Sequence, residues 1–271
     1  MRILNGSELA SFIKARQEVE VRSIFQSLHI RPKLAIIITV DNPVINLYVK
    51  LKEAYGKDIG VEVDIHRVRQ DQARDLINEL NKDDNIHGII VQLPIEDPKD
   101  TDELVNLVSG DKDVDALGKN AKFDPATPTA ILWLLAGYNV DFLGKKVLLI
   151  GEGKLVGKPL FRMLKDSSVD VAIANEETKN ISEMALNSDI IITATGSPAV
   201  LNSSMVKQKA VVVDAGVASE GGKTVGDVDE DLFERDDLTI TPKKGGVGPL
   251  TVCALFQNVL LSARRKAKEN S

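Results

Sequence analysis

The chain has 271 residues, a length that suggests two domains, and a formal net charge of −6. Its 43% hydrophobic and 27% charged residues are typical of a soluble globular protein. The negative charge and the low aromatic content of 4% disfavour nucleic acid as a partner. No apolar stretch approaches the ~20 residues of a membrane span, and no targeting segment is recognisable, so we expect small-molecule partners and no membrane.

Short apolar runs alternate with amphipathic segments, which predicts βαβ units and mostly parallel sheets. The expected strands are Lys33–Val40, Val61–His66, His87–Leu93, Lys146–Ile150, Val169–Ala174, Asp189–Ala194, Ala210–Asp214 and Leu238–Ile240. Gly, Asp, Lys and Pro cluster at 111–128 and mark the expected domain boundary, which a helix over Thr129–Leu135 follows. From 146 to about 240 the pattern describes a complete doubly wound domain. The predicted fold class is therefore α/β, with two domains.

The first candidate site lies on a helix that Asp41-Asn-Pro43 begins and that ends near Gly60, because a polar cap followed by proline favours a helix start. Tyr48 and Lys52 are four residues apart and share one face of this helix. A lysine desolvated beside a phenol can have a lowered pKa and transfer protons near neutrality. Taken alone, however, the spacing favours a boundary tyrosine and a solvated lysine.

Two further segments of the first half carry polar groups in unusual places. Gln92 stands at the carboxyl end of the apolar strand Ile89–Val91, and a buried glutamine must find hydrogen-bond partners in the protein or in a ligand. Lys112-Asp-Val-Asp115 places two acids in the expected linker between the domains.

The second half opens with the strand Lys146–Ile150 and a glycine-rich turn, Gly151 to Pro159. Glycine lets the backbone approach a pyrophosphate, and the following helix offers its N-terminus. The spacing Gly-x-Gly-x-x-x-Gly is one residue longer than the usual fingerprint. Later strands end in Asn175-Glu-Glu, Thr195-Gly-Ser-Pro198 and Asp214-Ala-Gly-Val217, which parallel strands would bring to the same edge. These loops together predict a dinucleotide site.

The last expected helix runs from about Pro249 to Lys268, after the loop Lys243-Lys-Gly-Gly-Val-Gly-Pro249. This loop is either a tight crossover to the first domain or backbone that lines a ligand cleft, and both can hold. The single cysteine, Cys253, lies in this helix and is expected to be a core residue of a protein from the reducing cytoplasm. The three histidines lack metal-ligand spacing, so we expect no metal.

Several motifs occur in one order along nearly the whole chain. They are Asp41-Asn-Pro43, Tyr48-Val-x-x-Lys52, Val91-Gln-Leu-Pro94, Lys112-Asp-Val-Asp115, Thr127-Pro128, Gly151 with Val156-Gly157-x-Pro159, Thr178-Lys-Asn180, Val225-Gly-Asp-Val228 and Gly245-Gly-Val-Gly-Pro-Leu-Thr251. In these the chain resembles the bifunctional methylenetetrahydrofolate dehydrogenase/methenyltetrahydrofolate cyclohydrolase family. The combination of Tyr-x-x-x-Lys with Gly-Gly-Val-Gly-Pro-x-Thr is highly specific.

The resemblance implies a cytoplasmic homodimer whose subunits have two domains with a folate cleft between them. A folate-binding, catalytic domain would comprise 1–120 plus 250–271, and a Rossmann-like dinucleotide-binding domain 121–249. The family oxidises 5,10-methylenetetrahydrofolate by hydride transfer to a nicotinamide cofactor and hydrolyses the methenyl product to 10-formyltetrahydrofolate.

The resemblance also implies roles for single residues. Lys52 would handle the proton of the attacking water or of the intermediate, Gln92 would support Lys52, and Tyr48 would contact the folate ring. Asp115 would bind the donor edge of the pterin. Further substrate contacts would come from Val91, Leu93, Gly245, Gly246, Val247, Gly248, Pro249 and Thr251. The cofactor would meet Gly151, Glu152, Gly153, Val156, Gly157, Asn175, Glu176, Thr195, Gly196 and Val217.

The sequence departs from the family where the cofactor's ribose is expected. The family commonly has Gly-Arg-Ser where this chain has Gly151-Glu-Gly153, and His with Ser or Arg where it has Asn175-Glu176. Family resemblance therefore favours NADP, whereas an acid at the second strand end suits the 2′-hydroxyl of NAD. Lys154, Lys158 or Lys179 could still reach a phosphate.

Other departures affect the folate pose. Ile45 stands where the family has serine, and Lys243-Lys244 replaces an apolar residue and proline. Two alternative functions are also compatible with the predicted dinucleotide site. A different Rossmann dehydrogenase, of the shikimate-dehydrogenase type, would share the glycine loop but would not need Tyr48, Lys52 and Gln92 together. A non-catalytic dinucleotide sensor would not need Lys52.

Overall fold

The computed structural model describes residues 1–216, 218–220 and 223–269, and the chain divides into two compact units. Unit 1 comprises Met1–Ala10 and Thr127–Thr251, and unit 2 comprises Ser11–Ala126 and the chain from Val252 onward. The chain passes from one unit to the other within α1 (Gly6–Leu28), at the start of α5 (Ala126–Gly137) and within α8 (Val247–Glu269). The predicted two-domain α/β fold is confirmed.

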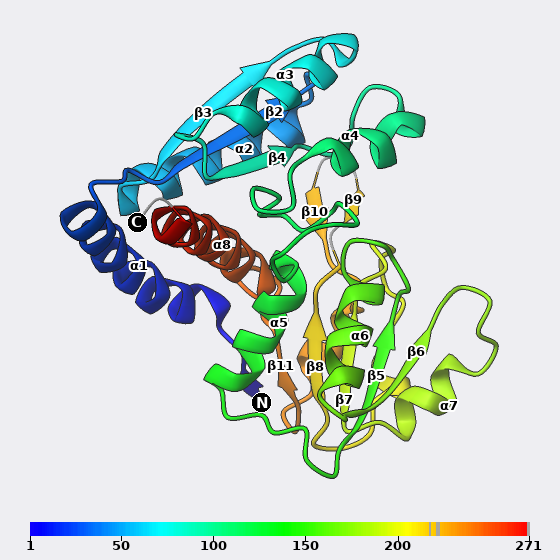
Figure 1. Cartoon of the computed structure of the whole chain (residues 1–271). Helices are drawn as coiled ribbons and strands as arrows, with labels where there is room; N and C mark the ends of the chain where they lie inside the picture. The colour runs from blue at the N-terminus through cyan, green and yellow to red at the C-terminus, as the bar shows by residue number, and fades with distance from the viewer. Residues whose placement is uncertain (217, 221–222, 270–271) are drawn as a thin grey trace. The chain divides into compact units, whose positions relative to one another are not determined.

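Unit 2 contains a parallel sheet of three strands in the order β3-β2-β4. The strands are β2 (Lys33–Ile38), β3 (Glu62–Arg67) and β4 (Gly88–Val91), joined by α2 (Pro43–Ile59) and α3 (Gln70–Lys82). The 3-10 turn η1 (Pro98–Asp100) and α4 (Thr101–Leu107) follow β4. The three strands predicted for the first half are thus present, and each is joined to the next by a helix (Figure 1).

Helix α2 begins and ends where its sequence predicts. The Asn42 side chain accepts a hydrogen bond from the backbone N–H of Val44 at 2.8 Å, and Pro43 occupies the first turn, where its missing N–H costs nothing. Gly60 ends the helix in the left-handed conformation at φ 84°. This helix therefore presents Tyr48 and Lys52 from a backbone that is fixed at both ends.

The core of unit 2 lies on both faces of its sheet. Ala35, Ile37 and Ile89 pack with Ile77 of α3 and with α4, and all four are at most 1% exposed. In the same unit, Tyr55 of α2 and Phe256 of α8 have ring centroids 5.0 Å apart.

Helix α8 corrects the expectation about apolar stretches. Its segment Val247–Ala267 has a mean hydropathy of 1.2, so by length and composition it could cross a membrane, but 61% of that window is buried in the protein. Cys253 is fully buried within it and accepts a hydrogen bond from the Tyr55 hydroxyl at 3.2 Å. The burial is that of a core helix, and the expected core position of the cysteine is confirmed.

Unit 1 contains a parallel six-stranded sheet in the order β1-β11-β8-β7-β5-β6. The predicted strands appear as β5 (Lys146–Ile150), β6 (Asp170–Ala174), β7 (Ile190–Thr193), β8 (Val211–Asp214) and β11 (Thr239–Ile240). Strand β1 (Arg2–Ile3) completes the edge, and β9 (Ala218–Glu220) pairs antiparallel with β10 (Lys223–Val225); none of these three was predicted. The remaining elements are α6 (Gly157–Asp166), α7 (Ile181–Leu186), η2 (Ser203–Met205) and η3 (Glu230–Glu234).

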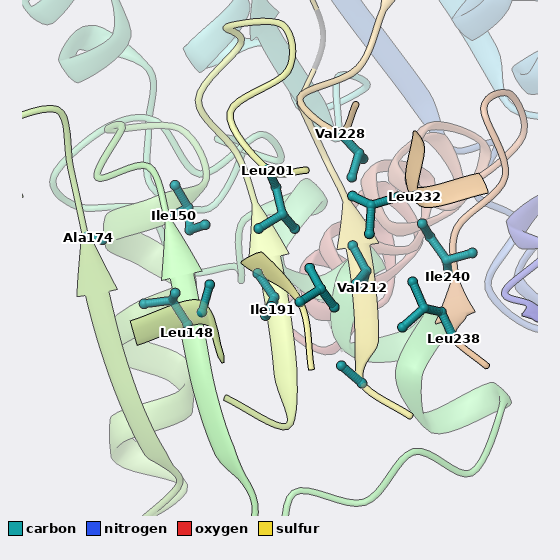
Figure 2. Close-up of a cluster of buried hydrophobic side chains, with 13 residues drawn as sticks. Leu148, Ile150, Ala174, Ile191, Leu201, Val212, Val228, Leu232, Leu238 and Ile240 are labelled. Carbon is teal, nitrogen blue, oxygen red and sulfur yellow. The ribbon is translucent and has the colours of Figure 1, made fainter. Parts of the chain in front are cut away.

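One face of this sheet carries a cluster of buried aliphatic side chains. Leu148, Ile191 and Val212 project from three adjacent strands, and Leu201 and Leu232 from the following loops cover them (Figure 2). All five are fully buried, and burial of one such side chain stabilises a fold by about 1.5–3 kcal/mol. This packing fixes the strands whose carboxyl ends carry the predicted cofactor residues.

Candidate functional site

The glycine-rich loop after β5 is shaped by contacts that exclude side chains. Gly151 has a φ of 111°, and a Cβ there would lie 2.5 Å from the carbonyl oxygen of Ala194. A Cβ on Gly157 would lie 1.9 Å from the carbonyl oxygen of Gly151. At Gly153, in contrast, a Cβ would meet nothing within 4 Å. The loop therefore closes on the N-terminus of α6 and leaves an open position, the cradle that a pyrophosphate group requires.

The strand order places this loop at a topological switch point. Strand β5 pairs with β6 on one side and with β7 on the other, and ligands of doubly wound sheets bind outside the carboxyl ends of such strands. The backbone N–H of Gly151 donates to Ala174 O, and that of Ala194 donates to Ile150 O, each at 2.8 Å. The loops after β5, β6 and β7 thus lie together, as the sequence predicted.

The loop after β6 is joined to the glycine loop by side chains. Asn175 Nδ2 donates to Glu152 Oε2 at 2.9 Å, and Lys158 Nζ lies 3.9 Å from Glu152 Oε1. Glu176 follows Asn175 on the exposed surface, and Val156 caps α6. Val217 lies outside the described residues. The Glu152 carboxylate in the glycine-rich loop is therefore held beside the carboxyl end of β6.

The buried carboxylate of Asp227 and the partly buried carboxylate of Asp214, to which the sequence assigned no role, hold the loops after β7 and β8. Asp227 Oδ2 accepts from the backbone N–H of Thr195 at 2.6 Å, whereas its buried Oδ1 has no hydrogen-bond partner within the described ranges. Asp214 accepts from the backbone N–H groups of Gly216 and Asp227 at 3.0 and 3.1 Å. A Cβ on Gly216 would lie 1.8 Å from Asp227 Oδ1, so glycine is required there. In the sequence, the motif Val225-Gly-Asp-Val228 was the feature that could have pointed to a role for Asp227.

In unit 2 the structure brings three of the predicted catalytic residues together. Lys52 Nζ donates to Gln92 Oε1 at 2.7 Å, and Gln92 Nε2 donates to Leu93 O at 3.0 Å. The backbone N–H of Gln92 donates to Ile37 O at the end of β2, which fixes the residue at the sheet edge. Burial lowers the pKa of Lys52, and the nearby charge of Asp115 opposes this shift.

The pKa of the Asp115 carboxyl group is shifted in the opposite direction to that of Lys52. Burial raises its pKa, and the charge of Lys52 acts in the opposite direction. Burial thus favours the neutral form of both groups, and a lysine with a lowered pKa releases its proton more readily than an exposed one.

The segment that carries Asp115 is not a linker, which corrects the sequence interpretation. The backbone N–H of Ile89 in β4 donates to Lys112 O at 2.8 Å, and Asp113 forms a β-bridge with Ile89. The buried Lys112 ammonium donates to the carbonyl oxygens of Leu80, Asn81 and Asp83 at 2.7 to 2.9 Å, at the end of α3. Asp115 thus extends from the body of unit 2.

The other predicted folate contacts of unit 2 lie around this group. Tyr48, one turn before Lys52 in α2, is 39% exposed, and Val91 is buried in β4. Ile45 is buried at 3% exposure on the core side of the helix.

The loop that contains Gly245, Gly246, Val247, Gly248, Pro249 and Thr251 belongs to unit 1. Gly245 has a φ of 80° and its carbonyl oxygen accepts from the backbone N–H of Ser7 at 2.9 Å. A Cβ on Gly6 would lie 1.8 Å from Gly246 O, so the loop packs closely on the first turn of α1. Helix α8 begins at Val247, two residues earlier than predicted, and places Gly248, Pro249 and Thr251 in its first turns.

A doubly wound sheet with a glycine loop at its switch point, in a chain that also holds a lysine whose pKa is lowered by burial, is typical of a two-domain, dinucleotide-dependent enzyme. Two family models match the chain: the tetrahydrofolate dehydrogenase/cyclohydrolase catalytic domain over residues 4–115, and the NAD(P)-binding domain of the same family over residues 125–267. The chain belongs to the tetrahydrofolate dehydrogenase/cyclohydrolase family, as its motifs predicted.

Relatives of this family match over nearly their whole length. The bifunctional protein FolD of Sulfurihydrogenibium sp. is 35% identical over 284 residues, covering 99% of this chain and 100% of that protein. The crystal structure of the FolD enzyme from Campylobacter jejuni has a TM-score of 0.92 at 34% identity, over 98% of this chain and 99% of the other. The Trypanosoma brucei enzyme, solved with NADP and an inhibitor, has a TM-score of 0.90 at 28% identity over 97% of both chains. The two alternative functions are not favoured by these matches.

Proposed function

We propose that this protein oxidises 5,10-methylenetetrahydrofolate to the methenyl compound and hydrolyses that product to 10-formyltetrahydrofolate. The observation that carries the proposal is the hydrogen bond from Lys52 Nζ to Gln92 Oε1 at 2.7 Å, with the pKa of Lys52 lowered by burial. A sensor without catalysis would not require a desolvated lysine held by a glutamine. The full-length match to bifunctional relatives supports both reactions.

In the hydrolytic reaction, Lys52 takes the proton of the water that attacks the methenyl carbon and returns a proton to the intermediate. Gln92 orients the amine, since its own amide is fixed by the Leu93 carbonyl. Asp115 accepts hydrogen bonds from the N–H groups of the pterin. Tyr48 contacts the folate ring from the exposed side of α2, and Val91 and Leu93 form the strand end beside it.

For the oxidative reaction, a bound nicotinamide dinucleotide would supply the hydride acceptor. The glycine cradle of Gly151 and Gly157 fits its pyrophosphate, because side chains are excluded there by contacts of 2.5 Å and less. Thr195 and Gly196, held by the Asp227 carboxylate, form the neighbouring wall. The residues Gly245–Thr251 contribute backbone to the folate site. Residues 1–120 plus 250–271 would form a folate domain, and residues 121–249 a dinucleotide-binding domain.

An absorbance assay with purified protein tests reaction and substrate together. Methylenetetrahydrofolate is supplied with NADP or with NAD, and formation of reduced cofactor and of the methenyl compound is followed. We expect oxidation with at least one cofactor and conversion of added methenyltetrahydrofolate without any cofactor. No reaction under either condition would refute the proposal.

Family resemblance also supports a cytoplasmic homodimer. Light scattering of the purified protein tests the dimer, and a monomer mass at micromolar concentration would contradict it. Localisation of the tagged protein in its native cell tests the compartment.

A further inference from the structure

We propose that Glu152 makes this protein bind NAD in preference to NADP. The inference rests on the proposed dehydrogenase function and names the residue that selects its cofactor. Glu152 lies in the glycine-rich loop after β5, and Asn175 directly follows β6.

Glu152 and Asn175 follow the carboxyl ends of two adjacent strands, β5 and β6. Strands β5 and β6 are neighbours in the sheet (Figure 1). In their register, Ile150 pairs with Ala174. Asn175 Nδ2 donates to Glu152 Oε2 at 2.9 Å. The carboxylate therefore stands at the carboxyl end of the second strand, where doubly wound enzymes contact the ribose of the adenosine.

The amide of Asn175 is held in one orientation by its own loop. Its Oδ1 accepts from the backbone N–H of Glu177 at 3.0 Å and from the Thr178 hydroxyl at 3.3 Å. Because Oδ1 faces these two donors, Nδ2 is directed away from them and toward Glu152. The side chain of Glu152 is 39% exposed, so a ligand can reach the carboxylate. The acid is thus positioned before any cofactor binds.

A carboxylate at the end of β6 has opposite effects on the binding of NAD and of NADP. It accepts hydrogen bonds from the ribose hydroxyls of NAD, whereas the 2′-phosphate of NADP carries nearly two negative charges. Two like unit charges 4 Å apart in water weaken binding about fivefold, so a phosphate there loses roughly 30-fold in affinity. Lys158 Nζ lies 3.9 Å from Glu152 Oε1, but its side chain is 53% exposed, so it only weakly offsets the negative charge of the carboxylate.

Direct binding measurements on the full-length protein test the inference without catalysis. Titration calorimetry gives Kd for NAD and for NADP, and we expect NADP to bind at least tenfold more weakly. In Glu152→Gln, which keeps an acceptor for Asn175, the ratio of the two Kd values is expected to fall at least fivefold. Glu183→Gln, an equal loss of charge on the exposed surface of α7, serves as the matched control and should keep the wild-type ratio.

Salt provides a second measurement that does not depend on the variants. If Glu152 repels the phosphate, higher ionic strength lowers the ratio of Kd for NADP over NAD in the wild-type protein. If Lys154, Lys158 or Lys179 captures the phosphate instead, the ratio starts at or below one and rises with salt, which would overturn the inference. Tight NADP binding with the predicted activity leaves the proposed function intact, whereas the binding of neither cofactor refutes the dehydrogenase itself.

Discussion

Replacement of Gly157 by alanine is the sharpest test of the dinucleotide site. The added Cβ would lie 1.9 Å from the carbonyl oxygen of Gly151, whereas ordinary contact begins at 3.4 Å. The shortfall is about 1.5 Å, and both atoms belong to backbone, so the phosphate loop must move as a whole. A misplacement of about 1 Å in a positioned reaction costs on the order of 100-fold in rate. We therefore expect kcat/KM of the dehydrogenase to fall about 100-fold or more.

The cyclohydrolase reaction supplies an internal reference, because Lys52, Gln92 and Asp115 all lie in unit 2. Hydrolysis of added methenyltetrahydrofolate by Gly157→Ala is expected to stay within about threefold of the wild type. Gly153→Ala is the matched control in the same loop, since its Cβ meets nothing within 4 Å, and its dehydrogenase loss should be far smaller. Equal dehydrogenase activities of the two variants would refute this account of the loop.

Three further results are expected. Lys52→Met should reduce hydrolysis of methenyltetrahydrofolate at least 100-fold and leave much of the oxidation, and unchanged formation of the formyl product would contradict the role of this lysine. Asp227→Asn should weaken binding of the nicotinamide cofactor about tenfold, because the hydrogen bond from Thr195 to the charged carboxylate contributes about 1.5–3 kcal/mol. Calorimetry measures this change, and an unchanged Kd would contradict the role of Asp227. His87 is buried and accepts a backbone hydrogen bond through Nδ1; burial, and then the charges of Lys112 and Lys266, lower its pKa to about 4. Its contribution to stability is therefore complete above about pH 6.5 and is lost as the pH falls toward 4, by up to about 3 kcal/mol. Urea unfolding across this range should show a smaller pH dependence for His87→Gln, and parallel curves would contradict the assignment.

Local signals predicted the elements that carry the site. Asn42-Pro43 and Gly60 mark the ends of α2 because caps act over a few residues, and the loop after β5 needs glycine for contacts within its own turn and with one neighbouring strand. The hydrogen bond between Lys52 and Gln92 joins residues 40 apart in sequence, so family resemblance supported it where spacing could not.

The remaining features depend on contacts that no local pattern contains. Lys112 lies in a segment whose composition is typical of a linker, but its ammonium donates to carbonyl groups about 30 residues earlier in the chain. Asp227 fixes Thr195 across 32 residues, and the two-residue strand β1 pairs with β11 from the opposite end of the sequence. Each of these arrangements is decided by the assembled sheet, because a single polar side chain has many alternative partners before folding.

The division of the chain has a consequence for its synthesis. Neither unit is a continuous stretch, because Met1–Ala10 belong to unit 1 and the residues from Val252 onward belong to unit 2. A ribosome therefore releases most of unit 2 before strands β5 to β11 of unit 1 exist, yet Phe256 and Cys253 of α8 reach the core of unit 2 only after those strands have been synthesised. Expression of 1–126 alone would leave the Tyr55 side of α2 without its covering helix. Engineering either activity as a separate fragment requires rejoining distant segments rather than cutting the chain at one point.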